Sequence, residues 1–406
     1  MNELCERLLA YLNSINYLSK HQHGFTKGKN TLTNLLETYN YVTKNLDLDR
    51  SVDVIYIDFE KAFDKIDIGL LIKKLFCIKC PTYIVNWLQS FLLRRSQRVS
   101  VRGVLSKSLP VLSGVPQGCV ISPLLFIVYI NDVFSLSITS ELNFFADDNI
   151  LYNLSENSST LQSDLITLHE WCKHNCLKIN IIKTCILRFG KPKNNVDYKI
   201  DGISLKQLNE VKDLGVFIDK TLGFGTQCLS VVKRASYLSY SVLKIFKFAT
   251  MESKYFIFKI FIKPLLDYNL IFYFPRTKTL ISLLEKVQRR FTKRICPVGL
   301  SYEQRLKLLS GFTIEKHYKI TALLIMYKIL YCDFQIDGFC YKLFSSKTRG
   351  ADSKISLPFL SQIFVNHSLF YVTLISGIHL NLRTRIFVLY QLSNIFLLKM
   401  FIEALA

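Results

Sequence analysis

The chain has 406 residues, half of them apolar and a fifth charged, so it is too hydrophobic for a disordered tail and long enough for two or three packed domains. The net charge is +21, but it is uneven: residues 1–230 carry 26 basic and 22 acidic side chains, and residues 231–406 carry 26 and 9. This asymmetry, +4 against +17, suggests that the second half binds a polyanion. A generally basic protein without such a partner explains the composition equally well.

The predicted elements alternate between helices and strands until about residue 230 and are almost wholly helical after it. Helices are predicted over 3–18, 31–46, 61–75, 81–93, 124–133 and 161–175. Strands are predicted over 52–59, 97–104, 177–189, 196–200 and 214–218, with a hairpin over 142–152. A polar, basic turn covers 21–28, and a Gly/Pro turn over 113–118 leads into the apolar helix. Residues 230–330 are helical and basic.

Several common classes of protein are disfavoured by what the sequence lacks. Residues 1–10 contain Glu3, Glu6 and Arg7 where a signal peptide needs an unbroken apolar core. No stretch reaches the ~18 uncharged apolar residues of a membrane helix, so no membrane partner is expected. Dinucleotide, P-loop and GxSxG hydrolase signatures are absent. The expected compartment is the nucleus or the cytoplasm, with the choice open.

The eleven cysteines are expected to be reduced thiols. Cys77 and Cys80 form a lone CxxC without a second pair at zinc spacing. A denser group follows later in the chain: His169, Cys172, His174 and Cys176. It lies in an amphipathic stretch, where a cysteine more often packs as a small hydrophobic side chain. Packing is therefore favoured over metal binding for both groups.

Three carboxylates fall at the ends of predicted strands. Asp147 and Asp148 occupy the tip of the hairpin, and Asp58 ends the most clearly buried strand. Adjacent carboxylates raise each other's proton affinity unless a cation is present. Their oxygens suit a hard cation such as Mg²⁺, and two ions ~3.5–4 Å apart can support phosphoryl transfer. An Asp-Asp pair alone is more often a solvated turn, because Asp is common in turns.

The segments around these carboxylates form an ordered series of motifs. In chain order they are 21–25 (HQHGF), 56–64 (YIDFEKAFD), 113–126 (SGVPQGCVISPLLF), 145–148 (FADD), 177–180 (LKIN) with Lys183 and Thr184, 214–216 (LGV), 284–291 (LEKVQRRF) and 301–306 (SYEQRL). In this order and spacing they resemble the reverse transcriptases of non-LTR retrotransposons, and among them the jockey-like group. The match covers roughly residues 3–330.

The resemblance implies roles for the acidic residues. Asp58 and Asp147 would bridge two Mg²⁺ ions, with Mn²⁺ as a substitute, and Asp148 would support them from the same turn. The metals would activate a primer 3′ hydroxyl and neutralise the triphosphate. Lys183 would act with them on the departing pyrophosphate as a proton donor or charge clamp. A lone lysine is more often simply solvated, so this role competes with a plain surface position.

The resemblance also implies a nucleotide-binding set: Phe59, Phe63, Gly114, Gln117 and Gly118. Phe63 lies five residues after Asp58, where this family carries an aromatic beneath the sugar of the incoming nucleotide that excludes a 2′ hydroxyl. Its alternative is a core Phe on a helix. The glycines allow close backbone approach to a base pair or sugar, and the Gln117 amide can both donate and accept hydrogen bonds there.

The basic half is predicted to bind nucleic acid. The predicted contact residues are Lys233, Arg234, Lys244, Lys286, Arg289, Arg290, Lys293 and Arg294. From Lys286 onward they recur at three- and four-residue spacing, which places them on one face of a helix. Such a face follows phosphates without reading sequence, and its affinity falls steeply with salt. A merely solvated basic face is the alternative.

The predicted fold class is α+β, a right-hand polymerase with a fingers-and-palm sheet domain followed by a helical thumb. The expected domains are partial fingers over 1–50, a palm with finger insertions over 51–229, a basic helical thumb over 230–330 and a divergent tail over 331–406. Relative to the family, the segment before residue 1 and an upstream endonuclease domain are expected to be missing. The stretch over residues 354–406, with five charged residues and no Trp, is either read in a shifted frame of a decaying element or is a divergent domain.

Three functions are compatible with the sequence. The favoured one is an RNA-directed DNA polymerase of a mobile element, with an RNA template, a DNA primer and dNTPs as partners and no dedicated protein partner. The second is an inactive remnant of the same fold that only binds RNA. The third, an RNA-templated RNA polymerase, is disfavoured by Phe63 and by Ala146, where that class usually carries a polar residue and a glycine.

Overall fold

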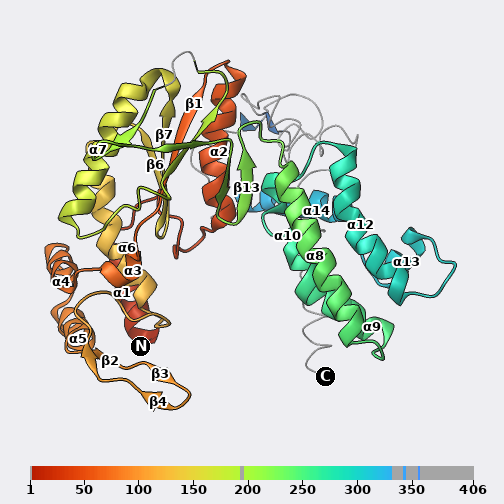
Figure 1. Cartoon of the computed structure of the whole chain (residues 1–406), viewed down its shortest axis with the longest axis horizontal. Helices are drawn as coiled ribbons and strands as arrows, with labels where there is room; N and C mark the ends of the chain where they lie inside the picture. Colours follow the sequence, from red (N-terminus) through yellow and green to blue (C-terminus); the bar gives the residue numbers. More distant parts are fainter. Residues whose placement is uncertain (1, 193–195, 332–341, 344–354, 357–406) are drawn as a thin grey trace. The chain divides into compact units, whose positions relative to one another are not determined.

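The computed structural model describes residues 2–192, 196–331, 342–343 and 355–356, and it divides the chain into two compact units (Figure 1). The first unit contains residues 1–34 and 49–209, and the second contains 35–48 and the chain from 210 onward. The domain boundaries expected from the sequence remain predictions. The predicted tail lies almost entirely outside the described residues, so the two interpretations of it stay open.

The elements of the first unit alternate along the chain. They are α1 (Asn2–Ser14), β1 (Val52–Ile57), α3 (Ala62–Lys65), α4 (Ile68–Cys77), α5 (Thr82–Leu92), β2 (Ser96–Gln97), β3 (Ser100–Val101), β4 (Val104–Leu105), β5 (Leu109–Pro110), α6 (Ser122–Ile130), η1 (Asn131–Ser135), β6 (Glu141–Phe145), β7 (Asp148–Leu154), η2 (Ser155–Asn157), α7 (Ser158–His174), β8 (Cys185–Phe189), β9 (Lys199–Ile200), β10 (Ile203–Ser204) and β11 (Lys206–Leu208). Helix α2 (Thr31–Asp47) begins in this unit and continues in the other.

The second unit is mainly helical. Its elements are β12 (Glu210–Asp213), β13 (Val216–Asp219), α8 (Gly225–Ile245), α9 (Met251–Ile257), the π-helix η3 (Phe258–Ile262), α10 (Lys263–Asp267), α11 (Leu270–Tyr273), α12 (Lys278–Ile295), α13 (Tyr302–Leu308), α14 (Ile314–Tyr331), β14 (Lys342–Leu343) and β15 (Ile355–Ser356). Among the described helices, none combines the length and the apolarity needed to cross a membrane.

A five-stranded sheet organises the first unit, in the order β11-β8-β1-β7-β6. The central strand β1 pairs antiparallel with β7 and β8, and all but one of its residues are buried, as its β-branched sequence predicts. Helix α7 packs against β7, and α6 is buried along its whole length except at Pro123. The register pairs Ile57 with Asn149. Continuing it by one residue places Asp58 opposite Asp148.

The single strand expected over 97–104 is wrong, because the chain turns back at Arg102 and Gly103, which both have a positive φ, and β3 pairs antiparallel with β4. Two further predicted elements differ from the observed ones. The helix expected over 61–75 is split into α3 and α4, because the Asp67 carboxylate caps α4 by accepting a hydrogen bond from the Leu70 N–H at 2.7 Å. The strand expected over 177–189 is regular only in β8. Its first part instead bonds to the chain just after β1, where Phe59 and Ile179 form an isolated bridge. Both differences depend on contacts that sequence periodicity does not encode.

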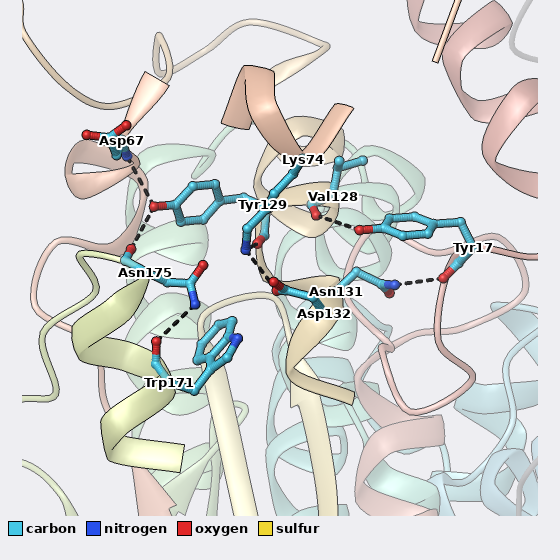
Figure 2. A network of polar contacts seen from close by, with 9 residues as sticks. All are labelled: Tyr17, Asp67, Lys74, Val128, Tyr129, Asn131, Asp132, Trp171 and Asn175. Atoms are coloured by element: carbon cyan, nitrogen blue, oxygen red, sulfur yellow. Dashed lines mark hydrogen bonds and ion pairs between the residues drawn. The ribbon is translucent and has the colours of Figure 1, made fainter. Parts of the chain in front are cut away.

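A partly buried polar network joins three helices of the first unit (Figure 2). The Lys74 ammonium on α4 donates to the Tyr129 carbonyl at 2.5 Å and to the Asp132 carboxylate at 2.8 Å. The Tyr129 hydroxyl donates to the Asn175 carbonyl at 2.6 Å and accepts from the Asp67 N–H at 3.3 Å. Burial lowers the pKa of Lys74, and the Asp132 carboxylate offsets this effect only in part. The network therefore fixes α4, α6 and the end of α7 to one another.

The Lys74→Met variant tests this network, because it keeps the packing against Tyr129 and removes the donors to Tyr129 and Asp132. We expect a loss of about 1–3 kcal/mol in the free energy of unfolding, since a buried carbonyl is left without its donor. The matched control is Lys73→Met on the exposed side of the same helix, which is expected to change stability by less than about 0.5 kcal/mol. Urea unfolding measures both, and equal losses in the two variants would contradict the account.

Candidate active site

The hairpin formed by β6 and β7 carries two of the three predicted carboxylates. Phe145 pairs with Asp148, so the two-residue turn consists of Ala146 and Asp147. Ala146 has a positive φ of 57°, and it is buried. Asp148 is therefore the first residue of β7 rather than part of the tip. Asp147 is the second residue of the turn, and Asp148 follows it directly in the chain.

Asp58 follows β1 and is held by the chain around residues 178–184. Its carbonyl accepts a hydrogen bond from the Asn180 N–H at 2.8 Å, and its own N–H donates to the Thr184 hydroxyl at 3.4 Å. The Lys183 ammonium lies 3.6 Å from a carboxylate oxygen of Asp58, and both side chains are partly open to solvent. The structure thus brings Lys183 and Asp58, both predicted site residues, together as an ion pair.

The three carboxylates interact electrostatically. Surrounding protein reduces the hydration of Asp148 although its side chain reaches solvent, and this effect, with the charges of Asp147 and Asp58, raises its pKa to about 6. Partial burial and the charge of Asp58 also raise the pKa of Asp147. Both shifts mean that the folded chain disfavours the fully ionised set. The site is therefore a concentration of negative charge that a cation would relieve.

The loop over residues 113–118 is fixed against α3 and the residue that follows it. Gly114 has a positive φ of 80°, and a Cβ there would lie 2.8 Å from backbone atoms of Asp64. The Gly114 N–H donates to the Ile66 carbonyl at 2.8 Å. The Gln117 side-chain amide donates to the Asp64 carboxylate at 2.9 Å. Gly118 also has a positive φ of 80°, but open space surrounds its Cβ position. The close backbone approach at Gly114 is thus to Asp64 of the same chain.

The two aromatic residues predicted to contact a nucleotide lie in different environments. Phe63 is partly buried and stacks on Phe126, with ring centroids 4.4 Å apart. Phe59 is only 6% exposed and belongs to the core of the first unit. Phe63, five residues after Asp58 in the sequence, is therefore partly open to solvent. The Phe59 side chain instead packs in the core.

Three polar residues close to the site had not been singled out from the sequence. Asp64 holds Gln117, Thr184 contacts the backbone of Asp58, and the Gln22 side chain accepts a hydrogen bond from the Ala146 N–H at 3.0 Å. Each lies inside a motif segment, so the motif order pointed to the right stretches of chain. The individual partners depend on how distant segments meet.

The predicted nucleic-acid contacts all lie in the second unit, on α8 and α12. All eight side chains are exposed: Lys233, Arg234, Lys244, Lys286, Arg289, Arg290, Lys293 and Arg294. The opposite face of α12 buries Leu284, Val287 and Phe291. The sole acid of α12, Glu285, is buried and accepts from the Tyr302 hydroxyl and, at 2.8 Å, from the Ile314 N–H. The exposed face of α12 therefore carries positive charge only.

Within the part of the chain that the structure describes, no three His, Cys, Asp or Glu side chains are grouped to hold a metal ion by themselves. His169 instead lies 2.9 Å from the Asp201 carboxylate, and Cys172 is buried. The carboxylates of Asp58, Asp147 and Asp148 supply hard oxygen donors without closing a coordination shell. That donor set fits Mg²⁺, which usually takes one or two carboxylates and completes its shell with water and substrate phosphates.

Comparison with known families assigns the fold that carries this site. The family model described as "Reverse transcriptase (RNA-dependent DNA polymerase)" matches residues 1–240. The chain belongs to the reverse transcriptase family. This membership confirms the predicted fold class, an α+β polymerase of the right-hand type. The matched stretch contains the three carboxylates, the 113–118 loop and Lys183.

Two relatives of the chain come from mobile elements of Drosophila melanogaster. The chain is 32% identical over 256 residues to a probable RNA-directed DNA polymerase from transposon BS of Drosophila melanogaster, covering 58% of this chain and 28% of that protein. It is 25% identical over 312 residues to the RNA-directed DNA polymerase from mobile element jockey of the same species, covering 72% and 33%. The resemblance to jockey-like elements is confirmed, and the chain spans a third or less of the length of these relatives.

Among solved structures the chain is similar to telomerases of Candida species. An apo telomerase from Candida tropicalis has a TM-score of 0.43 and 14% identity, covering 78% of this chain and 53% of that one. A Candida albicans telomerase bound to a fragment of telomeric RNA has a TM-score of 0.41 and 10% identity, covering 82% and 52%.

Replacing Asp148 by Asn tests the electrostatic description of the site. In metal-free buffer at pH 7.5 the variant is expected to have a free energy of unfolding higher by a few tenths to about 1 kcal/mol, a range that allows for solvent screening. The reason is that the substitution removes a carboxylate that the folded state prefers to protonate. The folded pKa is raised, so wild-type stability falls as pH rises from about 4 to 6, and the gain of the variant grows over the same range.

The control for this comparison is Asp201→Asn. The Asp201 carboxylate lies beside His169 and Lys173, which lower its pKa, so its removal is expected not to stabilise the fold. Urea unfolding at pH 4.5, 6 and 7.5 provides the measurement. A loss of stability in Asp148→Asn at pH 7.5 would show that the carboxylates do not repel one another.

Proposed function

We propose that the chain contains the catalytic core of an RNA-directed DNA polymerase from a jockey-like non-LTR retrotransposon. It would add dNTPs to the 3′ end of a primer on an RNA template. The observation that carries the proposal is the convergence of Asp58, Asp147 and Asp148 at one end of the central sheet of a reverse transcriptase fold. The raised pKa values of Asp147 and Asp148 support a site built for a cation.

Asp58, Asp147 and Asp148 are proposed to hold the divalent ions, Mg²⁺ or Mn²⁺. When bound, these ions would lower the pKa of the primer hydroxyl and neutralise the triphosphate. The chain itself contributes the positions of the carboxylates: the β1–β7 register sets Asp58 opposite Asp148, and the tight turn fixes Asp147 beside it. The residues around Asn180 and Thr184 hold the backbone of Asp58 in place.

Lys183 is proposed to act on the departing pyrophosphate. Its ammonium lies 3.6 Å from Asp58 and is 68% exposed, so it is tied only by a partly solvated ion pair. Such a pair contributes little stability and is easily exchanged for another anion. A polyphosphate close to Asp58 would therefore compete for the ammonium, which could then donate a hydrogen bond or a proton to the leaving group.

Phe63 and the 113–118 loop are proposed to shape the nucleotide site. Stacking on Phe126 limits the motion of the Phe63 ring, so a ring in this position can exclude a 2′ hydroxyl sterically. The Asp64 carboxylate holds the amide nitrogen of Gln117, which leaves the amide oxygen available as an acceptor. Nucleotide selection would thus rest on one fixed ring and one oriented amide.

The exposed basic face of α12 is proposed to bind the backbone of the template–primer duplex. Its cations recur along one face, while the acid of this helix is turned inward and hydrogen-bonded. Phosphate contacts of this kind provide affinity without sequence recognition, and they weaken as salt rises because counterions are released on binding.

Primer extension on an RNA template tests the proposed activity. With Mg²⁺ or Mn²⁺, the wild-type protein is expected to incorporate dNTPs in strong preference to rNTPs, and Asp147→Ala is expected to abolish incorporation, because the metal-binding carboxylate is lost. Asp201→Asn, an exposed carboxylate on another part of the first unit, serves as the control and should extend normally. Extension by Asp147→Ala at the wild-type rate would refute the assignment, and absence of extension by all three proteins would favour the RNA-binding remnant.

The basic face of α12 is tested by the double variant Arg290→Gln/Lys293→Gln. Each lost phosphate contact should reduce the slope of log K against log salt by about 0.7–0.9, so the slope for the double variant should fall by about 1.5. Fluorescence anisotropy with a labelled RNA–DNA duplex at several salt concentrations measures it. The control, Lys199→Gln/Lys206→Gln, removes two exposed lysines outside the predicted set. An equal slope change in both double variants would contradict a specific role of α12.

A further inference from the structure

The segment 21–24 passes directly beside the catalytic hairpin, and we call it the strap. The His23 N–H donates to the Phe144 carbonyl at 2.8 Å, and the Phe144 N–H donates to the His21 carbonyl at 3.0 Å. These bonds form an isolated parallel bridge between Gln22 and Phe144 on β6. The strap thus pairs with the hairpin two residues before the turn. The family resemblance includes this stretch but implies no task for it.

The side chain of Gln22 continues from this bridge to the turn itself. Its amide oxygen accepts hydrogen bonds from the Ala146 N–H at 3.0 Å and from the Gly24 N–H at 2.8 Å. Gln22 is 0% exposed, so water does not compete for these donors. Both partners are N–H groups, and the atom they share must therefore be the carbonyl oxygen of the amide. One buried oxygen connects the strap to the first residue of the turn.

Ala146 needs such an anchor because of its backbone conformation. Its φ of 57° lies in the left-handed region, where a residue with a Cβ is less stable than glycine. The Ala146 N–H is held at the point where β6 ends and the turn begins, and the next residue is Asp147. A change of backbone conformation at Ala146 would redirect the Asp147 side chain. Fixing this peptide therefore fixes where that carboxylate points.

Gly24 makes the close approach of the strap possible. A Cβ at this position would lie 2.4 Å from the Ala146 nitrogen and 3.0 Å from the Ala146 Cβ. Backbone atoms cannot yield at such a distance, so any larger residue would push the strap from the turn. The amide nitrogen of Gln22, in contrast, is buried without a hydrogen-bond partner among the described residues. The acceptor oxygen accounts for the need for glutamine here, and the nitrogen does not.

We propose that Gln22 is a positioning residue for polymerisation, which holds the Ala146 peptide so that Asp147 faces the site shared with Asp58. The inference rests on the proposed function, because it assigns the strap a task in the same reaction. It places the control of the catalytic turn in a segment more than a hundred residues earlier in the chain. Gly24 serves the same purpose by permitting the contact.

The test compares Gln22→Met with Gln227→Met. Methionine matches the length of glutamine but accepts no comparable hydrogen bond. Gln227 is a buried glutamine in the second unit whose oxygen accepts from the Phe217 N–H at 3.0 Å, so its variant controls for the loss of a buried backbone contact. Four quantities are measured: hydrogen exchange of the peptide containing Ala146, Mn²⁺ affinity, and the rate and the KM of single dNTP addition.

For Gln22→Met we expect hydrogen exchange at Ala146 to be at least about tenfold faster and Mn²⁺ binding to be weaker. Turnover should fall by about a hundredfold, as it does when a catalytic group is displaced, whereas KM for dNTP should change by less than about twofold. Gln227→Met should leave all of these at wild-type values. Unchanged exchange at Ala146, or turnover equal to that of Gln227→Met, overturns the proposal.

Two further outcomes keep the test decisive. If the wild-type protein extends no primer, the proposed polymerase activity fails, and hydrogen exchange with Mn²⁺ affinity still decides whether Gln22 positions the turn. If Gln22→Met does not fold, Gln22→Asn takes its place, because it keeps a polar amide but is one methylene too short to reach the Ala146 N–H. In that variant the same loss of protection supports the proposal, and retained protection overturns it.

Discussion

The close placement of Asp58, Asp147 and Asp148 is the constraint on which the site depends, because burial first and neighbouring negative charge second disfavour the ionised forms of Asp147 and Asp148. Strand pairing sets Asp58 against the hairpin that carries Asp147 and Asp148, and the raised pKa values of the latter two show that the fold holds them together at a cost. Such a cost is typical of sites where a bound cation takes part in the chemistry. The surrounding contacts of Asn180, Thr184 and Gln22 all act on the backbone that presents these side chains.

The same constraint helps to explain why the charge is distributed unevenly along the chain. Asp58, Asp147 and Asp148 of the first unit form a site that would repel nucleic acid by itself. In the second unit the exposed face of α12 is uniformly basic, because Glu285 is turned inward to Tyr302 and Ile314. The proposed division of labour follows from this pattern: one unit binds cations and a nucleotide, and the other supplies affinity for the phosphate backbone.

Sequence patterns predicted the elements that are determined by their own residues rather than by contacts with distant segments. Strand β1 is apolar and β-branched, and the hairpin alternates on both sides of its acidic turn, so both could be located from periodicity. The break between α3 and α4 was missed because the Asp67 cap competes with an otherwise helical pattern. The irregular segment before β8 was missed because it bonds to the chain after β1, a contact set by the tertiary fold. The partners of Asp64 and Gln22 could not be predicted for the same reason.

The central claim is that the three carboxylates hold divalent ions when substrate is present. Electron paramagnetic resonance of Mn²⁺ tests it directly, using the protein bound to an RNA template, a dideoxy-terminated primer and the next dNTP. We predict about two protein-dependent Mn²⁺ ions per complex, fewer in Asp58→Asn, and a count in Asp201→Asn equal to that of the wild type. An unchanged count in Asp58→Asn, or Mn²⁺ bound only in the proportion carried by the free dNTP, would contradict it.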